Sequence, residues 1–315
     1  MPLKNKIVIF LILCIITHLI LYVVFYRVAE KENPLLQQMA ACKKNSKVIK
    51  ILLIGDSHAE RSINAPGLDS TFSLAFYGEN NMFTYFKLKY CLENYQVRPK
   101  YVLLQCDLST YTKGFNYFRT NNFFYYSLVG ISDIREMRDE PVSEYYRYLK
   151  IKLFPYSDWQ YALNLAGKNR QKKGEATFTE RSTEEKTANA RNFMQNELMC
   201  SDKRENLFFT TSINYLKKTI VLCKEYNIKP VVIKYPLMQQ VFDVIKNEID
   251  STALQINNRP PEMLIRNLHI PVLDFEYFYA QRPDLFFDCH HLNNAGKLAF
   301  TRVFKHKLDS LLRSY

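Results

Sequence analysis

Residues 48–58, Val-Ile-Lys-Ile-Leu-Leu-Ile-Gly-Asp-Ser-His, join a short apolar run to a turn that carries a hydroxyl side chain. The run is rich in Ile and Leu, is too short to cross a membrane and ends at Gly55, so it predicts a buried central strand. Open α/β sheets bind their ligands at the carboxyl ends of their strands. Ser57 is therefore a candidate nucleophile, and the alternative is a serine that caps the next helix.

A second motif lies far downstream, just before the last predicted helix. It contains Asp288, His291, Asn293 and Gly296. Asp288 and His291 are three residues apart, a spacing that puts both side chains on one side of a turn. A serine nucleophile needs a base, and a carboxylate bonded to that base fixes its tautomer. Ser57, His291 and Asp288 are thus the candidate catalytic residues.

The two motifs resemble the first and last blocks of the SGNH (GDSL-type) hydrolase superfamily. Its Gly-Asp-Ser block matches residues 55–57, and its Asp-x-x-His block matches residues 288–291, with the downstream Asn and Gly also present. The resemblance spans residues 48–312 and implies a flavodoxin-like parallel sheet and acyl-ester chemistry. The layout looks most like the membrane-anchored branch that acts in O-acetylation of alginate and other envelope polymers, or in D-alanylation of teichoic acids.

The resemblance also implies an oxyanion hole. In the family, a block-two glycine donates its N–H beside the N–H of the serine, which carries over to Gly78 and Ser57; a plain turn glycine is the alternative at Gly78. The third block, Gly-x-Asn-Asp, is absent, because the third predicted strand runs into residues 105–108, Gln-Cys-Asp-Leu. This departure removes an Asn donor. Three amides are candidates to replace it: Asn80, Asn81 and Gln105.

Two more histidines adjoin the motifs. His58 follows Ser57 directly, so its side chain should point elsewhere, and we interpret it as a wall of the site. His290 is the rival of His291 as the base, because some envelope acetylation proteins carry Asp-x-His. The spacing to the downstream Asn and Gly favours His291. No dinucleotide fingerprint, Walker loop, CxxC pair or zinc knuckle occurs, so we expect no cofactor and no metal.

The N-terminus predicts a membrane anchor. Residues 7–26 are apolar and carry no formal charge. The stretch is about as long as one transmembrane helix. The stretch exceeds the usual signal-peptide core, and no Ala-x-Ala-like site follows closely, so a signal anchor is favoured. We expect residues 1–33 to form a cytoplasmic stub and a single span. Residues 34–315 would then form a hydrolase-like domain outside the cytoplasmic membrane.

Short apolar strands alternate with helical stretches in that domain, which predicts an α/β fold with a parallel sheet. A large insertion, about residues 109–211, follows the third strand. Its first half is aromatic, which suits sugar stacking or a small core, and residues 168–191 are polar and predict a solvated segment. The expected elements are strands at 49–54, 72–77, 101–104, 229–234 and 270–275 and helices at 81–95, 212–226 and 294–312.

Charge and cysteines restrict the partners. The net charge is +12, but the lysines are dispersed and no nucleic-acid motif occurs, so anionic lipid or an acidic envelope glycan fits better than nucleic acid. The seven cysteines show no tight spacing pattern. We expect an esterase or O-acyl(acetyl)transferase that acts on cell-envelope glycans, with a membrane-bound acyltransferase as a candidate partner. The alternative is a non-catalytic envelope assembly or scaffold protein that keeps the fold.

Overall fold

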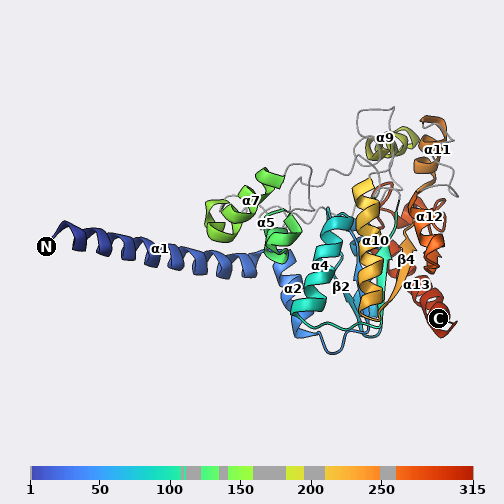
Figure 1. The fold of residues 1–315 in the computed structure, drawn as a ribbon. Helices are drawn as coiled ribbons and strands as arrows, with labels where there is room; N and C mark the ends of the chain where they lie inside the picture. The colour runs from blue at the N-terminus through green and yellow to red at the C-terminus, as the bar shows by residue number, and fades with distance from the viewer. Residues whose placement is uncertain are drawn as a thin grey trace. The chain divides into compact units, whose positions relative to one another are not determined.

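The computed structural model describes residues 2–107, 110, 122–134, 141–158, 182–194, 210–248 and 260–314 (Figure 1). The chain divides into two compact units, Met1–Ala41 with Asn121–Lys172, and Cys42–Thr120 with Lys173–Tyr315. Each unit is described by itself. The domain limits expected from the sequence stay a prediction.

The second unit is built on a five-stranded sheet in which every neighbouring pair of strands is parallel. The spatial order is β2-β1-β3-β4-β5, the order of flavodoxin-like folds. The predicted α/β fold with a parallel sheet is confirmed. The strands are β1 (Ile51–Ile54), β2 (Thr71–Ser73), β3 (Tyr101–Gln105), β4 (Lys229–Lys234) and β5 (Val272–Asp274).

Helices cover the sheet and hide the apolar side chains of its central strands. In Figure 1, α4 (Asn81–Asn94) and α10 (Thr210–Glu225) lie side by side on one face, and the two helices are in contact. α13 (Asn294–Ser314) packs against α3 (Ser57–Ser62), where the Asn64 N–H donates to Thr301 Oγ1 at 2.9 Å. The remaining described elements of this unit are η1 (Ala65–Gly67), α9 (Thr183–Phe193), α11 (Gln239–Glu248), α12 (Pro260–Asn267) and η7 (Pro283–Leu285).

Three predicted strands are shorter than expected, and the first of them, β1, begins at Ile51 rather than at residue 49. β2 ends at Ser73 rather than Tyr77, although the N–H groups of Leu74 and Phe76 still donate to the carbonyls of Leu53 and Gly55. The chain therefore continues beside β1 as an irregular segment, which brings the loop containing Gly78 close to the end of β1. β5 spans Val272–Asp274 and pairs with β4 on one side only, at the edge of the sheet.

The first unit begins with α1 (Leu3–Glu32), whose side chains are mostly exposed. Among the described residues it is the one helix long and apolar enough to cross a membrane, by length and composition. His18 Nδ1 on this helix lies 2.7 Å from the hydroxyl of Tyr156. The other elements are α5 (Asn122–Leu128), α6 (Ile131–Ile134), α7 (Pro141–Leu153) and η3 (Pro155–Asp158). The boundary between the two units falls within α2 (Pro34–Lys44).

The described parts of the insertion modify the sequence interpretation. Tyr125 and Tyr126 are buried, which fits the small-core interpretation of the aromatic half. Helix α9 was not expected, because residues 183–193 contain few apolar side chains; a capping box formed by Ser182 and Glu185 begins it. Trp159 and residues 168–181 of the predicted solvated segment lie outside the described residues.

Candidate active site

The turn after β1 is shaped by the neighbouring strand. Gly55 has a φ of 155°, and a Cβ there would overlap the side chain of Gln105, lying 2.8 Å from its Cβ. Only glycine tolerates this close approach and this backbone angle together. The Asp56 N–H then donates to Gln105 Oε1 at 2.8 Å, which ties the turn to the end of β3.

Ser57 is the first residue of α3, and it does not cap that helix. The cap is Asp56, whose carboxylate accepts from the His58 N–H at 2.8 Å. The alternative of a capping serine is therefore wrong. The Ser57 side chain is buried, with 8% of its surface exposed, and its hydroxyl points to a histidine from a distant part of the chain.

The structure brings the three predicted catalytic residues together. His291 Nε2 lies 2.8 Å from Ser57 Oγ, and His291 Nδ1 lies 2.8 Å from Asp288 Oδ2. The other carboxylate oxygen, Asp288 Oδ1, accepts from the backbone N–H groups of His290 at 3.0 Å and His291 at 2.7 Å. Asp288 is thus held by the same turn that presents His291. A proton can pass from Ser57 to His291 without any rearrangement of these three side chains.

Asn293 and Gly296, which follow this turn, have structural roles. Asn293 Oδ1 accepts from the Gly296 N–H at 2.8 Å at the start of α13, and Asn293 Nδ2 donates to the carbonyl of Asp284 at 2.8 Å. A Cβ on Gly296 would overlap the carbonyl oxygen of Leu285. Asn293 and Gly296 therefore fix the loop against the helix, and the catalytic chemistry does not need to involve them.

Burial and charge set the protonation states of the pair. Burial lowers the pKa of His291 below its usual 6.5, although the hydrogen bond and charge of Asp288 oppose the shift. Burial alone would raise the pKa of Asp288, but the adjoining His290 and His291 hold it well below its usual range. At neutral pH the arrangement is therefore a carboxylate beside a neutral imidazole, which is the state a general base requires.

A second histidine–carboxylate pair lies beside the first. His58 Nδ1 is 2.9 Å from Asp107 Oδ2, and both side chains are buried. Asp107 also accepts from Gln105 Nε2 at 2.7 Å and from the Tyr235 N–H at 2.9 Å. The sequence analysis missed Asp107; the available signal was a polar Gln-Cys-Asp run at the carboxyl end of a predicted strand.

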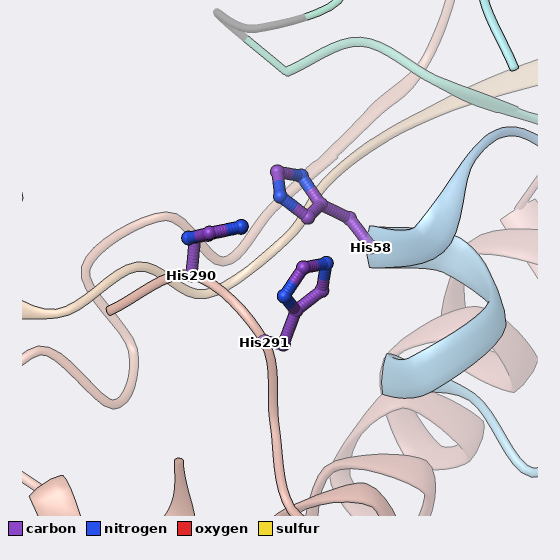
Figure 2. Close-up of side chains that lie close together, drawn as sticks. All are labelled: His58, His290 and His291. Atoms are coloured by element: carbon purple, nitrogen blue, oxygen red, sulfur yellow. The ribbon is translucent and has the colours of Figure 1, made fainter. Parts of the chain in front are cut away.

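His58 and His290 both face His291, as Figure 2 shows. The ring centroid of His58 lies 5.2 Å from that of each of the other two. His58 thus lines the site, as expected of a wall residue. The expectation that its side chain points elsewhere is wrong, because its ring lies beside that of His291. His290 Nδ1 is 3.4 Å from Asp288 Oδ1, and its ring stacks on Phe193 with centroids 4.1 Å apart. It is His291, and not His290, whose hydrogen bond to Ser57 the structure shows.

Helix α9 closes the back of this cluster. Besides the stacking of Phe193 on His290, Asn189 Oδ1 accepts from the Cys289 N–H at 2.9 Å. Sequence reasoning had placed Asn189 in a solvated segment. Its contact with the Asp-x-x-His turn shows that part of the insertion belongs to the wall of the site.

Gly78, the second predicted oxyanion donor, follows β2 in the chain. Gly78 lies in a turn in which the Glu79 N–H donates to the Phe76 carbonyl at 3.3 Å, and its φ of 74° requires the left-handed region that favours glycine. This accounts for the glycine by turn geometry alone. Its role as a donor stays a prediction.

Of the three amides that could replace the missing donor, two are committed elsewhere. Gln105 bonds at both ends to Asp56 and Asp107, and Asn81 Nδ2 donates to Ser212. Asn80 Oδ1 caps α4 at 3.1 Å from the Phe83 N–H, and Asn80 Nδ2 is buried with no hydrogen-bond partner among the described residues. All three amides line one cavity of about 10 Å³, so the unbonded Nδ2 is what distinguishes Asn80. Asn80 is therefore the best placed of the three.

Comparisons with known proteins found no sequence relative and one distant structural likeness that we describe below. No protein-family model matches the chain. No curated protein matches it either. A solved structure described as a "putative acylhydrolase", from Bacteroides fragilis, is similar at 10% sequence identity and a TM-score of 0.41, covering 86% of this chain and 95% of its own. A likeness at that TM-score supports no inference about fold or activity, so what the site can do follows from its own side chains.

Proposed function

We propose that the chain is a serine acyl-ester hydrolase or O-acyltransferase of the SGNH type. The observation that carries the proposal is the hydrogen-bonded series from Ser57 through His291 to Asp288, with 2.8 Å at each of its two links. This series joins a nucleophile, a base and an orienting acid, which is the arrangement that activates a serine hydroxyl.

In the proposed reaction, Ser57 Oγ attacks the carbonyl carbon of an acyl ester while His291 Nε2 accepts the hydroxyl proton. Asp288 holds the imidazole in the tautomer that leaves Nε2 as acceptor and stabilises the imidazolium that forms. His291 then gives the proton to the departing alcohol, and the acyl group stays on Ser57. Water or another hydroxyl then attacks the acyl-enzyme while His291 takes its proton. The bond to Ser57 Oγ breaks, and His291 returns the proton to that oxygen.

The tetrahedral intermediates carry a negative oxygen that needs donors. We assign the N–H groups of Ser57 and Gly78 to this role, and Asn80 Nδ2 to the third position that the family's missing Asn would fill. A donor of this kind contributes about two to three orders of magnitude in turnover.

The acceptor decides the outcome of the reaction. Water gives an esterase, and a sugar hydroxyl gives a transferase. We propose cell-envelope glycans as substrates, with α1 as a single-pass membrane anchor, the catalytic domain on the extracytoplasmic side and a membrane-bound acyltransferase as acyl donor. The support for this finer proposal is the length and apolar composition of α1 together with the motif resemblance.

The proposal is tested with p-nitrophenyl acetate and the detergent-solubilised full chain. We expect slow release of p-nitrophenol that falls to background in Ser57→Ala. Ser310→Ala, an exposed serine on α13, is the matched control and should retain the full rate. Equal rates in wild type and Ser57→Ala would contradict the proposal and favour the non-catalytic scaffold function.

A further inference from the structure

Three imidazoles from two distant segments converge at the candidate site. His58 comes from the first turn of α3, and His290 and His291 come from the turn before α13. One ring nitrogen of each lies within 4.8 Å of the others, and all three side chains are buried. Figure 2 shows the three rings turned toward a common space. The catalytic proposal uses His291 alone, so it does not explain this grouping.

Each of the three rings also has a carboxylate against its Nδ1. His58 Nδ1 lies 2.9 Å from Asp107, and His291 Nδ1 lies 2.8 Å from Asp288. His290 Nδ1 lies 3.4 Å from Asp288 and 3.3 Å from the thiol of Cys289. In metal centres, a ligating imidazole typically bonds to a carboxylate through its second nitrogen, which fixes the tautomer and increases the basicity of the ligating atom. His58 and His291 each have such a carboxylate bond. We therefore assign Nε2 of each ring as the ligating atom.

We propose that His58, His290 and His291 form a binding site for Zn²⁺. Three imidazole nitrogens with one open position are a ligand set that zinc accepts in catalytic centres. A zinc–nitrogen bond of about 2.0–2.1 Å puts tetrahedral ligands roughly 3.3 Å apart, so the widest pair must close by up to about 1.5 Å from 4.8 Å. The proposal therefore requires rotation of the three side chains about χ1 and χ2 when the ion binds.

The Ser57 hydroxyl lies 2.8 Å from His291 Nε2, the same nitrogen that would bind the ion. A zinc ion on that nitrogen occupies the lone pair that the serine proton needs. Zinc binding and serine acylation therefore exclude each other, and zinc is an inhibitor of the esterase. This second part rests on the proposed function, whereas the binding of zinc does not.

The test measures metal binding directly. The full chain in detergent is freed of metal with a chelator and titrated with ZnCl₂ by calorimetry and with CoCl₂ by visible absorption. We expect one ion per chain, the absorption bands of four-coordinate Co²⁺, and at least tenfold weaker binding in His58→Gln and in His290→Gln. His306→Gln, an exposed histidine on α13, is the control and should bind as wild type does. The melting temperature of each variant shows whether it is folded.

Two results would overturn the inference. One is wild-type binding no tighter than that of folded His58→Gln and His290→Gln; the other is the absence of the Co²⁺ bands in wild type. Ser57→Ala separates the two proposals, because it lacks esterase activity but should bind zinc within about threefold of wild type. If zinc binds but does not lower the ester rate at least tenfold, the metal site stands and the mutual exclusion is wrong.

Discussion

Replacing Asp288 with Asn should abolish activity while leaving the fold intact. In the native turn, Asp288 Oδ1 accepts two backbone N–H groups, at 3.0 and 2.7 Å. An amide side chain satisfies both donors only with its oxygen in that position. Its NH₂ group must then point to His291 Nδ1, which has to become an acceptor. The proton moves to Nε2, and the imidazole can no longer accept a proton from Ser57.

The expected loss follows from this change of tautomer. A wrong tautomer at an otherwise intact triad lowers turnover by about four orders of magnitude, or roughly 5.5 kcal/mol of barrier. The stability cost should be much smaller. Both backbone bonds persist and lose only their charge assistance, for a total of about 1–2 kcal/mol.

The assay is ester hydrolysis of Asp288→Asn beside a urea unfolding curve of the same sample. The matched control is Asp284→Asn. Asp284 lies four residues before Asp288, is half-buried and pairs with the exposed Arg282. It should keep its rate within about twofold and lose less than 1 kcal/mol of stability. A folded Asp288→Asn variant that keeps more than a tenth of the wild-type rate would show that Asp288 does not orient the base.

Three further predictions concern the surroundings of the site. Since burial holds the pKa of His291 below 6.5 and the neutral imidazole is the active form, the ester rate should be at its plateau at pH 7 and fall with an apparent pKa below 6.5; a midpoint above 7 would contradict this. Asn80→Ser keeps a cap oxygen but removes the amide donor, so turnover should drop about 10²- to 10³-fold with little change in melting temperature, whereas Asn81→Ser should lower the melting temperature more than the turnover. Lys87→Met leaves the buried partner Glu79 uncompensated and should cost about 3–5 kcal/mol in urea unfolding, whereas Lys305→Met, at an exposed pair with Asp69, should cost less than 1; equal costs would refute the buried pair.

The parts of the fold that could be predicted are those that short stretches of sequence determine by themselves. The Ile and Leu run before Gly55 has few alternatives to a buried strand, and the spacing from Asp288 to His291 already fits a single turn. The parallel order of the strands followed from their alternation with helices. These features depend on short stretches of sequence, so a single sequence was enough to identify them.

Features that depend on contacts between distant residues were missed. No feature of the neighbouring sequence indicates that Asp107 bonds to His58, because the two residues meet only when β1 and β3 pair in register. Helix α9 has too few apolar residues to show a helical stripe, and it is fixed by its cap and by the packing of Phe193 on His290. The grouping of three histidines was hidden for the same reason, since only folding brings His58 beside the other two.

The central claim is that Ser57 is a nucleophile activated by His291. The most direct measurement is reaction of the full chain with a fluorophosphonate, followed by mass spectrometry of the labelled peptide. We predict a single adduct on Ser57 that forms at least a hundredfold more slowly in His291→Ala and within about tenfold of the wild-type rate in His290→Gln. Absence of an adduct on Ser57 in the folded wild-type protein, or labelling that depends on His290 and not on His291, would contradict the account.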